Sequence, residues 1–154
     1  MSTTEVKILV PDNRLMASLV GQHDENLRLV EGAFPGTSIL VRGNQITIGG
    51  KESEKVGRLF DEIVLLLKQG HGVDPTNIGR TIDMVKSDES PSEVLGTQVL
   101  RSSAGKTVRP KTAGQKRYVE AISSNVVTFG IGPAGTGKSY LAVALGLQFL
   151  QAKT

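Results

Sequence analysis

Residues 126–139 read Val126-Val127-Thr128-Phe129-Gly130-Ile131-Gly132-Pro133-Ala134-Gly135-Thr136-Gly137-Lys138-Ser139, and an apolar run from Tyr140 to Leu145 follows them. The first six residues have the pattern of a buried strand. The next eight match G-x-x-x-x-G-K-[ST], and the apolar run is typical of the opening of a helix. A strand, a glycine-rich loop and a helix in this order predict a phosphate-binding P-loop.

Each residue type in this loop has a physical role in holding a nucleoside triphosphate. Gly135 and Gly137 allow backbone conformations in which successive N–H groups point inward and form an anion-binding nest. The helix that follows adds the positive end of its dipole. We expect Lys138 to contact the β- and γ-phosphates of ATP and the Ser139 hydroxyl to bind Mg²⁺. The nucleotide-binding residues predicted in the loop are Gly132, Pro133, Ala134, Gly135, Thr136, Gly137, Lys138 and Ser139.

Gln115, seventeen residues before Gly132, is a candidate for reading the base. Its position is similar to that of the adenine-reading glutamine of superfamily I helicases, and one amide can donate to and accept from adenine together. A structural role competes, because Thr112-x-x-Gln115 is also a capping box for the helix that holds Tyr118. The two roles are compatible. Tyr118, one turn later, is a candidate for packing on the adenine or ribose, or else a core residue.

Charge is distributed unevenly along the chain. The formal net charge is +3, but residues 1–100 carry −4 and residues 101–154 carry +7. Six Lys and Arg side chains lie between residues 101 and 117 with no acid among them. Such a run favours contact with the phosphates of a nucleotide or nucleic acid, and a solvated linker is the alternative interpretation.

Length and composition exclude several classes of protein. The 154 residues suffice for one ordinary domain or two small ones, and 38% of them are hydrophobic. The chain has no cysteine, which excludes disulfide scaffolds and cysteine-based metal sites or nucleophiles, and its two histidines alone cannot complete a four-ligand metal site. No stretch approaches the ~20 apolar residues of a membrane span, and the first residues lack a signal pattern. We therefore expect a soluble, cytoplasmic protein with no membrane partner.

Secondary-structure signals predict a small α+β domain over residues 1–70. The predicted order is β-α-α-β-β-α, with Gly43-Asn44 as a two-residue hairpin turn. We expect Asp24 and Ser53 to cap the second and third helices. The predicted strands are residues 6–10, 38–42 and 45–48, and the predicted helices centre on residues 15–20, 27–30 and 53–69.

Residues 71–110 are predicted to connect this domain to the P-loop segment. Thr76 is a candidate N-cap for a short helix within the connection. Two short strands, residues 99–101 and 107–109, are predicted to pair as a hairpin. Residues 111–154 then form the start of an incomplete α/β P-loop nucleoside triphosphatase domain.

The β-α-α-β-β-α order, with a glycine-containing loop between its first two helices, resembles the KH RNA-binding fold. In that family a G-x-x-G loop lets the backbone approach single-stranded nucleic acid. The matching loop here is Gly21-Gln22-His23-Asp24, in which an acid replaces the final glycine and would repel phosphates. We therefore expect a KH-like domain that contacts RNA through this loop or acts as a structural or protein-docking module.

Several of these segments together resemble the PhoH family, which includes PhoH-like or YbeZ-type proteins. The resemblance rests on Arg109-Pro110-Lys111-Thr112, Gln115, Tyr118 and the P-loop with its flanks. Asp24-Glu25-Asn26-Leu27-Arg28 and the KH-like order resemble the longer members. The resemblance implies a cytoplasmic, helicase-related protein that binds and hydrolyses ATP. It also implies roles in RNA metabolism, association with a YbeY-type endoribonuclease and a tendency to form homo-oligomers.

The machinery for hydrolysis is incomplete in this sequence. A P-loop ATPase also needs an acid at the end of another strand to organise Mg²⁺ and water, and only fifteen residues follow Ser139. We therefore expect an N-terminal piece of a longer protein that hydrolyses ATP poorly by itself. The alternative function is a non-enzymatic KH-like RNA- or protein-interaction module with a vestigial P-loop, in which the basic segment 101–117 holds RNA or a partner without nucleotide.

Overall fold

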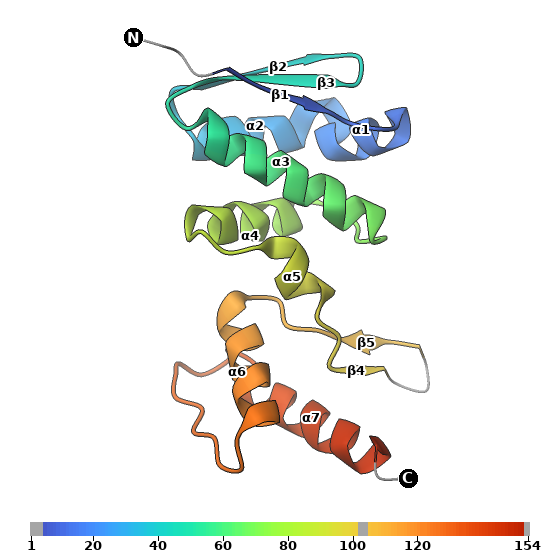
Figure 1. Ribbon diagram of the computed structural model, residues 1–154, viewed down its shortest axis with the longest axis vertical. Coiled ribbons are helices and arrows are strands. Elements are labelled where there is room, and N and C mark those ends of the chain that lie inside the picture. Colours follow the sequence, from blue (N-terminus) through green and yellow to red (C-terminus); the bar gives the residue numbers. More distant parts are fainter. Residues whose placement is uncertain (1–4, 102–104, 153–154) are drawn as a thin grey trace. The chain divides into compact units, whose positions relative to one another are not determined.

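The computed structural model describes residues 5–101 and 105–152 (Figure 1). The chain divides into two compact units between residues 92 and 93. Helices and small antiparallel sheets are both present, so the chain is a mixed α and β protein, as the sequence predicts. Residues 102–104, in the predicted turn of the 99–109 hairpin, lie outside the described residues.

The first unit contains the β-α-α-β-β-α order that the sequence predicts, and this prediction is confirmed. A short 3₁₀ turn, η1 (Gln22–Asp24), lies between the first two helices, and α4 (Pro75–Lys86) follows the third helix. The strands are β1 (Glu5–Leu9), β2 (Thr37–Arg42) and β3 (Gln45–Gly50), and the helices are α1 (Asn13–Val20), α2 (Glu25–Ala33) and α3 (Ser53–Lys68). The KH-like identity of the unit stays a prediction.

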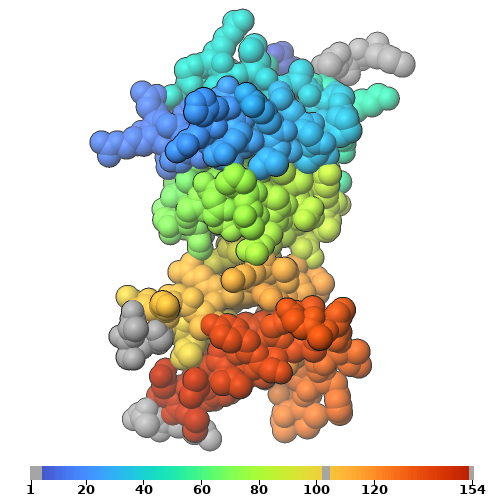
Figure 2. All heavy atoms as spheres, turned by 180° about the vertical axis from the view of Figure 1, so that it is seen from behind, coloured from blue at the N-terminus to red at the C-terminus, as the bar shows by residue number. Residues whose placement is uncertain are grey.

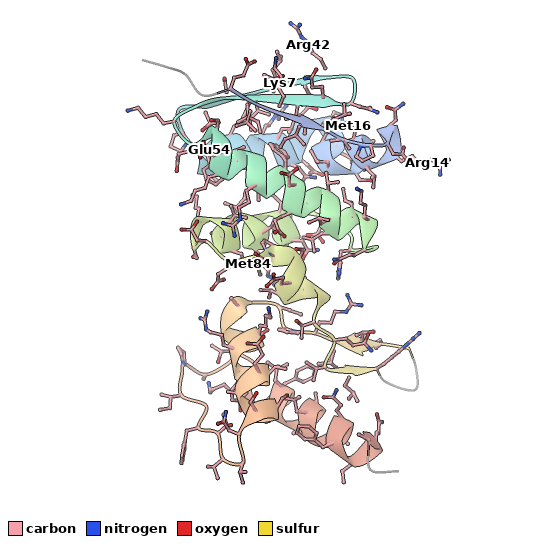
Figure 3. The ribbon with its side chains drawn as sticks, viewed as in Figure 1. Lys7, Arg14, Met16, Arg42, Glu54 and Met84 are labelled. Atoms are coloured by element: carbon pink, nitrogen blue, oxygen red, sulfur yellow. The ribbon has the colours of Figure 1, made fainter. Side chains whose placement is uncertain are left out.

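The three strands form an antiparallel sheet in the order β1-β3-β2. The β2–β3 hairpin turns at the predicted Gly43-Asn44, where Gly43 has a φ of 58° that costs little without a Cβ. Helices cover one face of the sheet, with α3 packed across β1 and β3. The other face is exposed and carries Lys7 and Arg42, which point away from the helices in Figure 3.

The helices and one face of the sheet enclose the core of this unit. The apolar residues of α3 recur at helical spacing and form one buried face, as the sequence predicts. Helix α4 packs against α2 and α3 and adds its own apolar face to the same core, and Figure 2 shows the blue residues of α2 against the green residues of α4. The largest side chains that are at most 1% exposed in this core are Leu19, Phe34, Ile46, Ile48, Leu59, Phe60, Ile63 and Ile78.

Two of the three predicted N-caps in this unit are wrong. Helix α4 is capped by Asp74, whose Oδ1 accepts a hydrogen bond of 2.9 Å from a backbone N–H three residues on, and Thr76 lies inside the helix. Asp74 precedes Pro75, and proline is favoured as the first residue of a helix. Ser53 is the first residue of α3 and is buried instead of capping it. Asp24 stands at the N-cap position of α2, with a φ of 61° and no side-chain cap bond.

A short hairpin and two long helices build the second unit. The predicted hairpin is confirmed, with Leu100 paired to Val108 and Arg101 paired to Thr107. The elements are α5 (Pro91–Gly96), which spans the division between units, β4 (Leu100–Arg101), β5 (Thr107–Val108), α6 (Ala113–Ser124) and α7 (Lys138–Ala152). The buried core of the second unit consists of Val99, Val119, Leu141, Ala144 and Leu145.

The strand predicted for residues 126–131 is not formed, so this prediction is wrong. The segment joins α6 to α7 without regular structure, and its Val126 and Ile131 side chains are almost fully exposed. A buried parallel strand needs neighbouring strands for its hydrogen bonds and cover on both of its faces. Neither sheet within the described residues supplies such neighbours. The strand-like composition therefore occurs here without the partners that would make it a strand.

Helix α7 is apolar on nearly all sides, but only one side is buried. Leu141, Ala144 and Leu145 contribute to the second core, whereas Val143 and Leu150 are 63% and 68% exposed. Figure 2 shows α7, in red, at the surface of the molecule. In spite of this apolar character, no helix in residues 5–101 and 105–152 is both long and apolar enough to cross a membrane.

Candidate functional site

The glycine-rich loop, residues 132–137, connects the irregular segment 126–131 to α7. Gly135 and Gly137 have φ values of 76° and 86°, in the left-handed region that residues with a Cβ rarely adopt. Helix α7 begins immediately after the loop, and the Leu141 N–H donates to the Gly137 carbonyl at 3.0 Å. The two glycines therefore have the kind of backbone conformation that the motif requires of them.

The Lys138 side chain folds back over this loop. Its Nζ donates to the Gly132 carbonyl at 3.0 Å, to the Pro133 carbonyl, and to the Thr136 hydroxyl at 3.0 Å. The Thr136 hydroxyl in turn donates to the Pro133 carbonyl at 3.0 Å. A lysine ammonium has three N–H donors, and these three acceptors match them. All three are uncharged, so an anionic group at the loop would compete strongly for the same lysine.

Ser139, the predicted Mg²⁺ ligand, lies exposed in the first turn of α7. Within the described residues, no group of three or more His, Asp or Glu side chains could hold a metal ion. A single hydroxyl supplies one corner of the octahedral oxygen shell that Mg²⁺ prefers. Ser139 would therefore fit a Mg²⁺ ion only if phosphates and water supplied the other ligands, and Mg²⁺ binding stays a prediction.

Gln115 lies in the first turn of α6 and bridges two segments of the unit. The Thr112 hydroxyl accepts a hydrogen bond from the Gln115 N–H at 3.2 Å, so Thr112 caps α6 as the sequence predicts. The Gln115 side-chain oxygen accepts from the Lys111 N–H at 2.6 Å. Its Nε2 donates to the Thr136 carbonyl of the glycine-rich loop at 3.0 Å. Thr112 thus caps α6, but the Gln115 oxygen accepts from the residue before the cap instead of from the cap itself, so the predicted capping box is realised only in part. Base reading by Gln115 stays a prediction.

Tyr118 is half-buried one turn further along α6 and packs against the second core. The side chain also approaches the backbone at Gly130, where an added Cβ would lie 3.0–3.2 Å from two ring carbons and the hydroxyl oxygen of Tyr118. Real Cβ contacts are rarely this short, so the close approach of the ring depends on glycine at this position. The core role that the sequence left open for Tyr118 is therefore observed, and its contact with a nucleotide stays a prediction.

Gln115, Tyr118 and the glycine-rich loop line one pocket of ≈ 360 Å³. This volume lies within the ~300–1,000 Å³ typical of small-molecule sites. Lys138 is the only charged residue among the described residues that line it, which makes the pocket suited to an anion. The predicted site residues that line it are Gln115, Tyr118, Gly132, Pro133, Thr136 and Lys138, and those that do not are Ala134, Gly135, Gly137 and Ser139.

Sequence reasoning missed several residues of the pocket wall. The sequence interprets Thr112 as a helix cap only, and Phe129 and Ile131 as parts of a buried strand, yet all three line the pocket. Gly130 also lines it and faces the Tyr118 ring. The only signal for these residues is their place in the chain, directly before the P-loop motif and around Gln115. The remaining lining residues are Gly114 and Leu141.

The basic segment 101–117 is partly engaged in contacts of its own. Lys116 forms ion pairs with Glu93 at 3.3 Å and with Glu120 at 3.7 Å. Arg109 donates to the Leu95 carbonyl at 3.5 Å. Surface ion pairs contribute little, about 0–1 kcal/mol each, so the two pairs of Lys116 do not exclude a stronger anionic partner for this lysine.

The fold and the pocket together define a class: a mixed α and β chain with a glycine-rich loop and a lysine at the start of a helix. Comparison with known proteins gives the family. Residues 107–154 match the family model PhoH, described as "PhoH-like protein". The chain is 42% identical over 143 residues to the PhoH-like protein of Mycobacterium tuberculosis strain H37Rv, which covers 90% of this chain. The chain belongs to the PhoH family.

Two further relatives share the same description. The PhoH-like protein of Bacillus subtilis strain 168 is 34% identical over 149 residues, and that of Synechocystis is 28% identical over 155 residues. The chain spans 40% of the length of the Mycobacterium tuberculosis relative, 46% of the Bacillus subtilis relative and 47% of the Synechocystis relative. No solved structure matches the chain.

Proposed function

We propose that the chain binds ATP with Mg²⁺ at residues 132–139, as the nucleotide-binding part of a PhoH-like P-loop ATPase that acts in RNA metabolism. The observation that carries the proposal is the shared pocket of Gln115, Tyr118 and the loop that carries Lys138. The site has two parts. One part is the loop, with its positive-φ glycines, the Lys138 cation and the start of α7, and the other is the Gln115 amide with the Tyr118 ring.

The chemistry of the two sides matches the two ends of ATP. The left-handed glycines and the start of α7 suit phosphates, because backbone N–H groups and the helix dipole both favour negative charge. Lys138 would exchange its uncharged carbonyl and hydroxyl acceptors for phosphate oxygens, and Ser139 would hold Mg²⁺. Gln115 and Tyr118 would then face the adenosine, which makes the ligand an adenine nucleotide instead of a free phosphate.

Hydrolysis, RNA and partner proteins belong to the wider proposal. The residues that line the pocket include no Asp or Glu among the described part of the chain, so the proposed hydrolysis needs a carboxylate from outside this pocket. We propose that the whole protein is cytoplasmic, forms homo-oligomers and acts on RNA, with a YbeY-type endoribonuclease as a partner. These assignments follow from the family resemblance.

The decisive test is calorimetric binding of Mg·ATP to the chain and to its Lys138→Ala variant. Lys138→Ala should lower the affinity by roughly 10- to 100-fold, because hydrogen bonds to a charged group contribute about 1.5–3 kcal/mol. Lys68→Ala, which removes an exposed lysine from the end of α3, is the matched control and should bind normally. Equal affinity of the Lys138→Ala and Lys68→Ala variants would contradict the proposal.

A second candidate is a KH-like interaction module without nucleotide dependence, which the observed β-α-α-β-β-α order favours. In this candidate the basic segment 101–117 binds single-stranded RNA. Binding should then weaken steeply with salt, stay unchanged when Mg·ATP is added and fall when Arg109, Lys111 and Lys116 are neutralised together. An RNA affinity that depends on ATP, or no binding at low salt, would exclude it.

A further inference from the structure

The Gln115 side chain connects the start of α6 to the Thr136–Gly137 peptide of the glycine-rich loop. Its Nε2 donates to the Thr136 carbonyl at 3.0 Å, across 21 residues of sequence. Its oxygen is held in turn by the Lys111 N–H at 2.6 Å, so the amide cannot rotate without losing both bonds. The side chain therefore spans from the entry of α6 to the loop as a fixed brace.

A second observation places the same amide against the next residue of the loop. A Cβ added at Gly137 would lie 3.1 Å from the Gln115 Nε2 and 3.9 Å from its Cδ. Gly137 has a φ of 86°, so this glycine is needed both for its backbone angle and for the close approach of the glutamine. The brace and the loop conformation are thus fitted to each other.

The bond to Thr136 fixes a direction that matters for anions. In a planar trans peptide the carbonyl and the following N–H point in opposite directions. When Gln115 holds the Thr136 carbonyl, the Gly137 N–H is held pointing away from Gln115. In an anion-binding nest, affinity depends on N–H groups that already point at the ligand, because reorienting them at binding costs free energy.

We propose that Gln115 is a positioning residue for the triphosphate: it holds the Thr136–Gly137 peptide in the phosphate-binding conformation, independently of any contact with the base. This inference rests on the proposed function of the same site. Positioning the loop and reading the base are different roles, and Gln115 can perform both. An amide has two N–H donors and two oxygen lone pairs, so one of each remains for a base after the two hydrogen bonds of the brace are formed.

Two ligands separate the roles, namely Mg·ATP and base-free Mg·tripolyphosphate. Calorimetry would compare the chain with Gln115→Met, which keeps the length of the side chain and removes its hydrogen bonds. We expect Gln115→Met to bind tripolyphosphate about 3- to 10-fold more weakly, the loss expected for one hydrogen bond. The exposed Gln98→Met is the matched control and should bind both ligands normally. A loss with ATP but not with tripolyphosphate, or no loss with either ligand, would overturn the inference.

The ligand-free protein provides a second, independent readout. In ¹⁵N–¹H spectra, Gln115→Met should shift the Gly137 amide resonance and speed its hydrogen exchange, and Gln98→Met should not. Gln115→Glu keeps the acceptor for the Lys111 N–H but no longer donates to Thr136, so it should shift the Gly137 amide as well. An unchanged Gly137 amide in both Gln115 variants, with helix content preserved by circular dichroism, would overturn the inference. If the unmodified chain binds neither ligand, the proposed function fails, and these spectra still decide whether the brace exists.

Discussion

The two units of this chain differ in how completely they bury their large apolar side chains. In residues 5–92 the large apolar side chains are mostly enclosed, and only Leu9 and Leu40 among them are 45% exposed or more. In the second unit nine large apolar side chains are 45% exposed or more, although its hairpin and helices do enclose a small core. The exposed ones are Val126, Val127, Phe129, Ile131, Tyr140, Val143, Leu147, Phe149 and Leu150.

The difference lies in the layers that each unit possesses. The first unit has a three-stranded sheet with helices on one face and a further helix behind them, which is sufficient to close a core. The second has two long helices, most of the short α5 and a hairpin of two-residue strands, with no sheet beside segment 126–131 within the described residues. An apolar pattern therefore predicts burial only where a second layer of structure is present to pack against it.

The largest expected effect comes from removing equal side chains from the two regions. Leu59→Ala in α3, where the leucine is 0% exposed, should lower the free energy of unfolding by about 2–5 kcal/mol. Leu150→Ala in α7, where the leucine is 68% exposed, should change it by less than about 0.5 kcal/mol. Urea denaturation followed by circular dichroism measures both. Similar losses for the two variants would remove the contrast between the units.

Glycine replacements should give the next largest effect. A Cβ at Gly50 would lie 2.5 Å from the Gly36 carbonyl oxygen, and the residue has a φ of 126°. Gly50→Ala should therefore cost about 2–3 kcal/mol. At Gly135 the φ is 76°, and no atom beyond this residue and its two chain neighbours lies within 4 Å of an added Cβ. Gly135→Ala should cost only the backbone strain of about 1 kcal/mol. Thermal unfolding of both variants tests whether Gly50→Ala destabilises the protein more than Gly135→Ala does. An equal or greater destabilisation by Gly135→Ala would contradict this prediction.

The two units can also be compared through one helix N-cap in each, where replacement by alanine should cost about 1 kcal/mol of stability. Asp74 accepts from a backbone N–H at 2.9 Å at the start of α4, and Thr112 does so at 3.2 Å at the start of α6. Replacing either by alanine should destabilise its own helix by about 1 kcal/mol. Amide hydrogen exchange should report the loss for Asp74→Ala in α4 and for Thr112→Ala in α6. Loss of protection spread equally over both units would show that the units do not respond separately.

The smallest expected effect concerns Asp61 on α3. Partial burial of this side chain, and secondly the neighbouring Glu62 carboxylate, raise the pKa of Asp61 above its ordinary value. A carboxyl whose pKa is higher in the folded than in the unfolded state destabilises the fold when ionised, and the penalty disappears as the pH falls below both values.

Asp61→Asn should therefore stabilise the protein at pH 7, by less than about 0.5 kcal/mol because the group is largely exposed. This stabilisation should vanish at about pH 3, where the Asp61 carboxyl is neutral in both the folded and the unfolded state. Urea denaturation at the two pH values measures it, with Asp83→Asn on α4 as the control for loss of one exposed charge. A stabilisation by Asp61→Asn that increases as the pH falls would contradict the predicted pH dependence.

Local patterns predicted most of the first unit. The Gly43-Asn44 turn, the apolar face of α3 and the β-α-α-β-β-α order depend on residues close together in the chain, and all three are confirmed. The N-caps show the limit of such patterns, because several neighbouring Asp, Ser and Thr residues can each serve as a cap. Asp74 is the cap instead of Thr76 because Pro75 follows it, a preference that is visible in the sequence.

The sequence by itself determined the family and predicted a phosphate-binding loop, because glycine, lysine and serine at fixed spacing act within a single turn of backbone. Only the tertiary structure decided that segment 126–131 remains irregular, since a strand requires partners that lie elsewhere in the chain. It also decided that the Gln115 amide meets the Thr136 carbonyl. A hydrogen bond between residues so distant in sequence exists only after α6 and the loop have packed together, so no local pattern could indicate it.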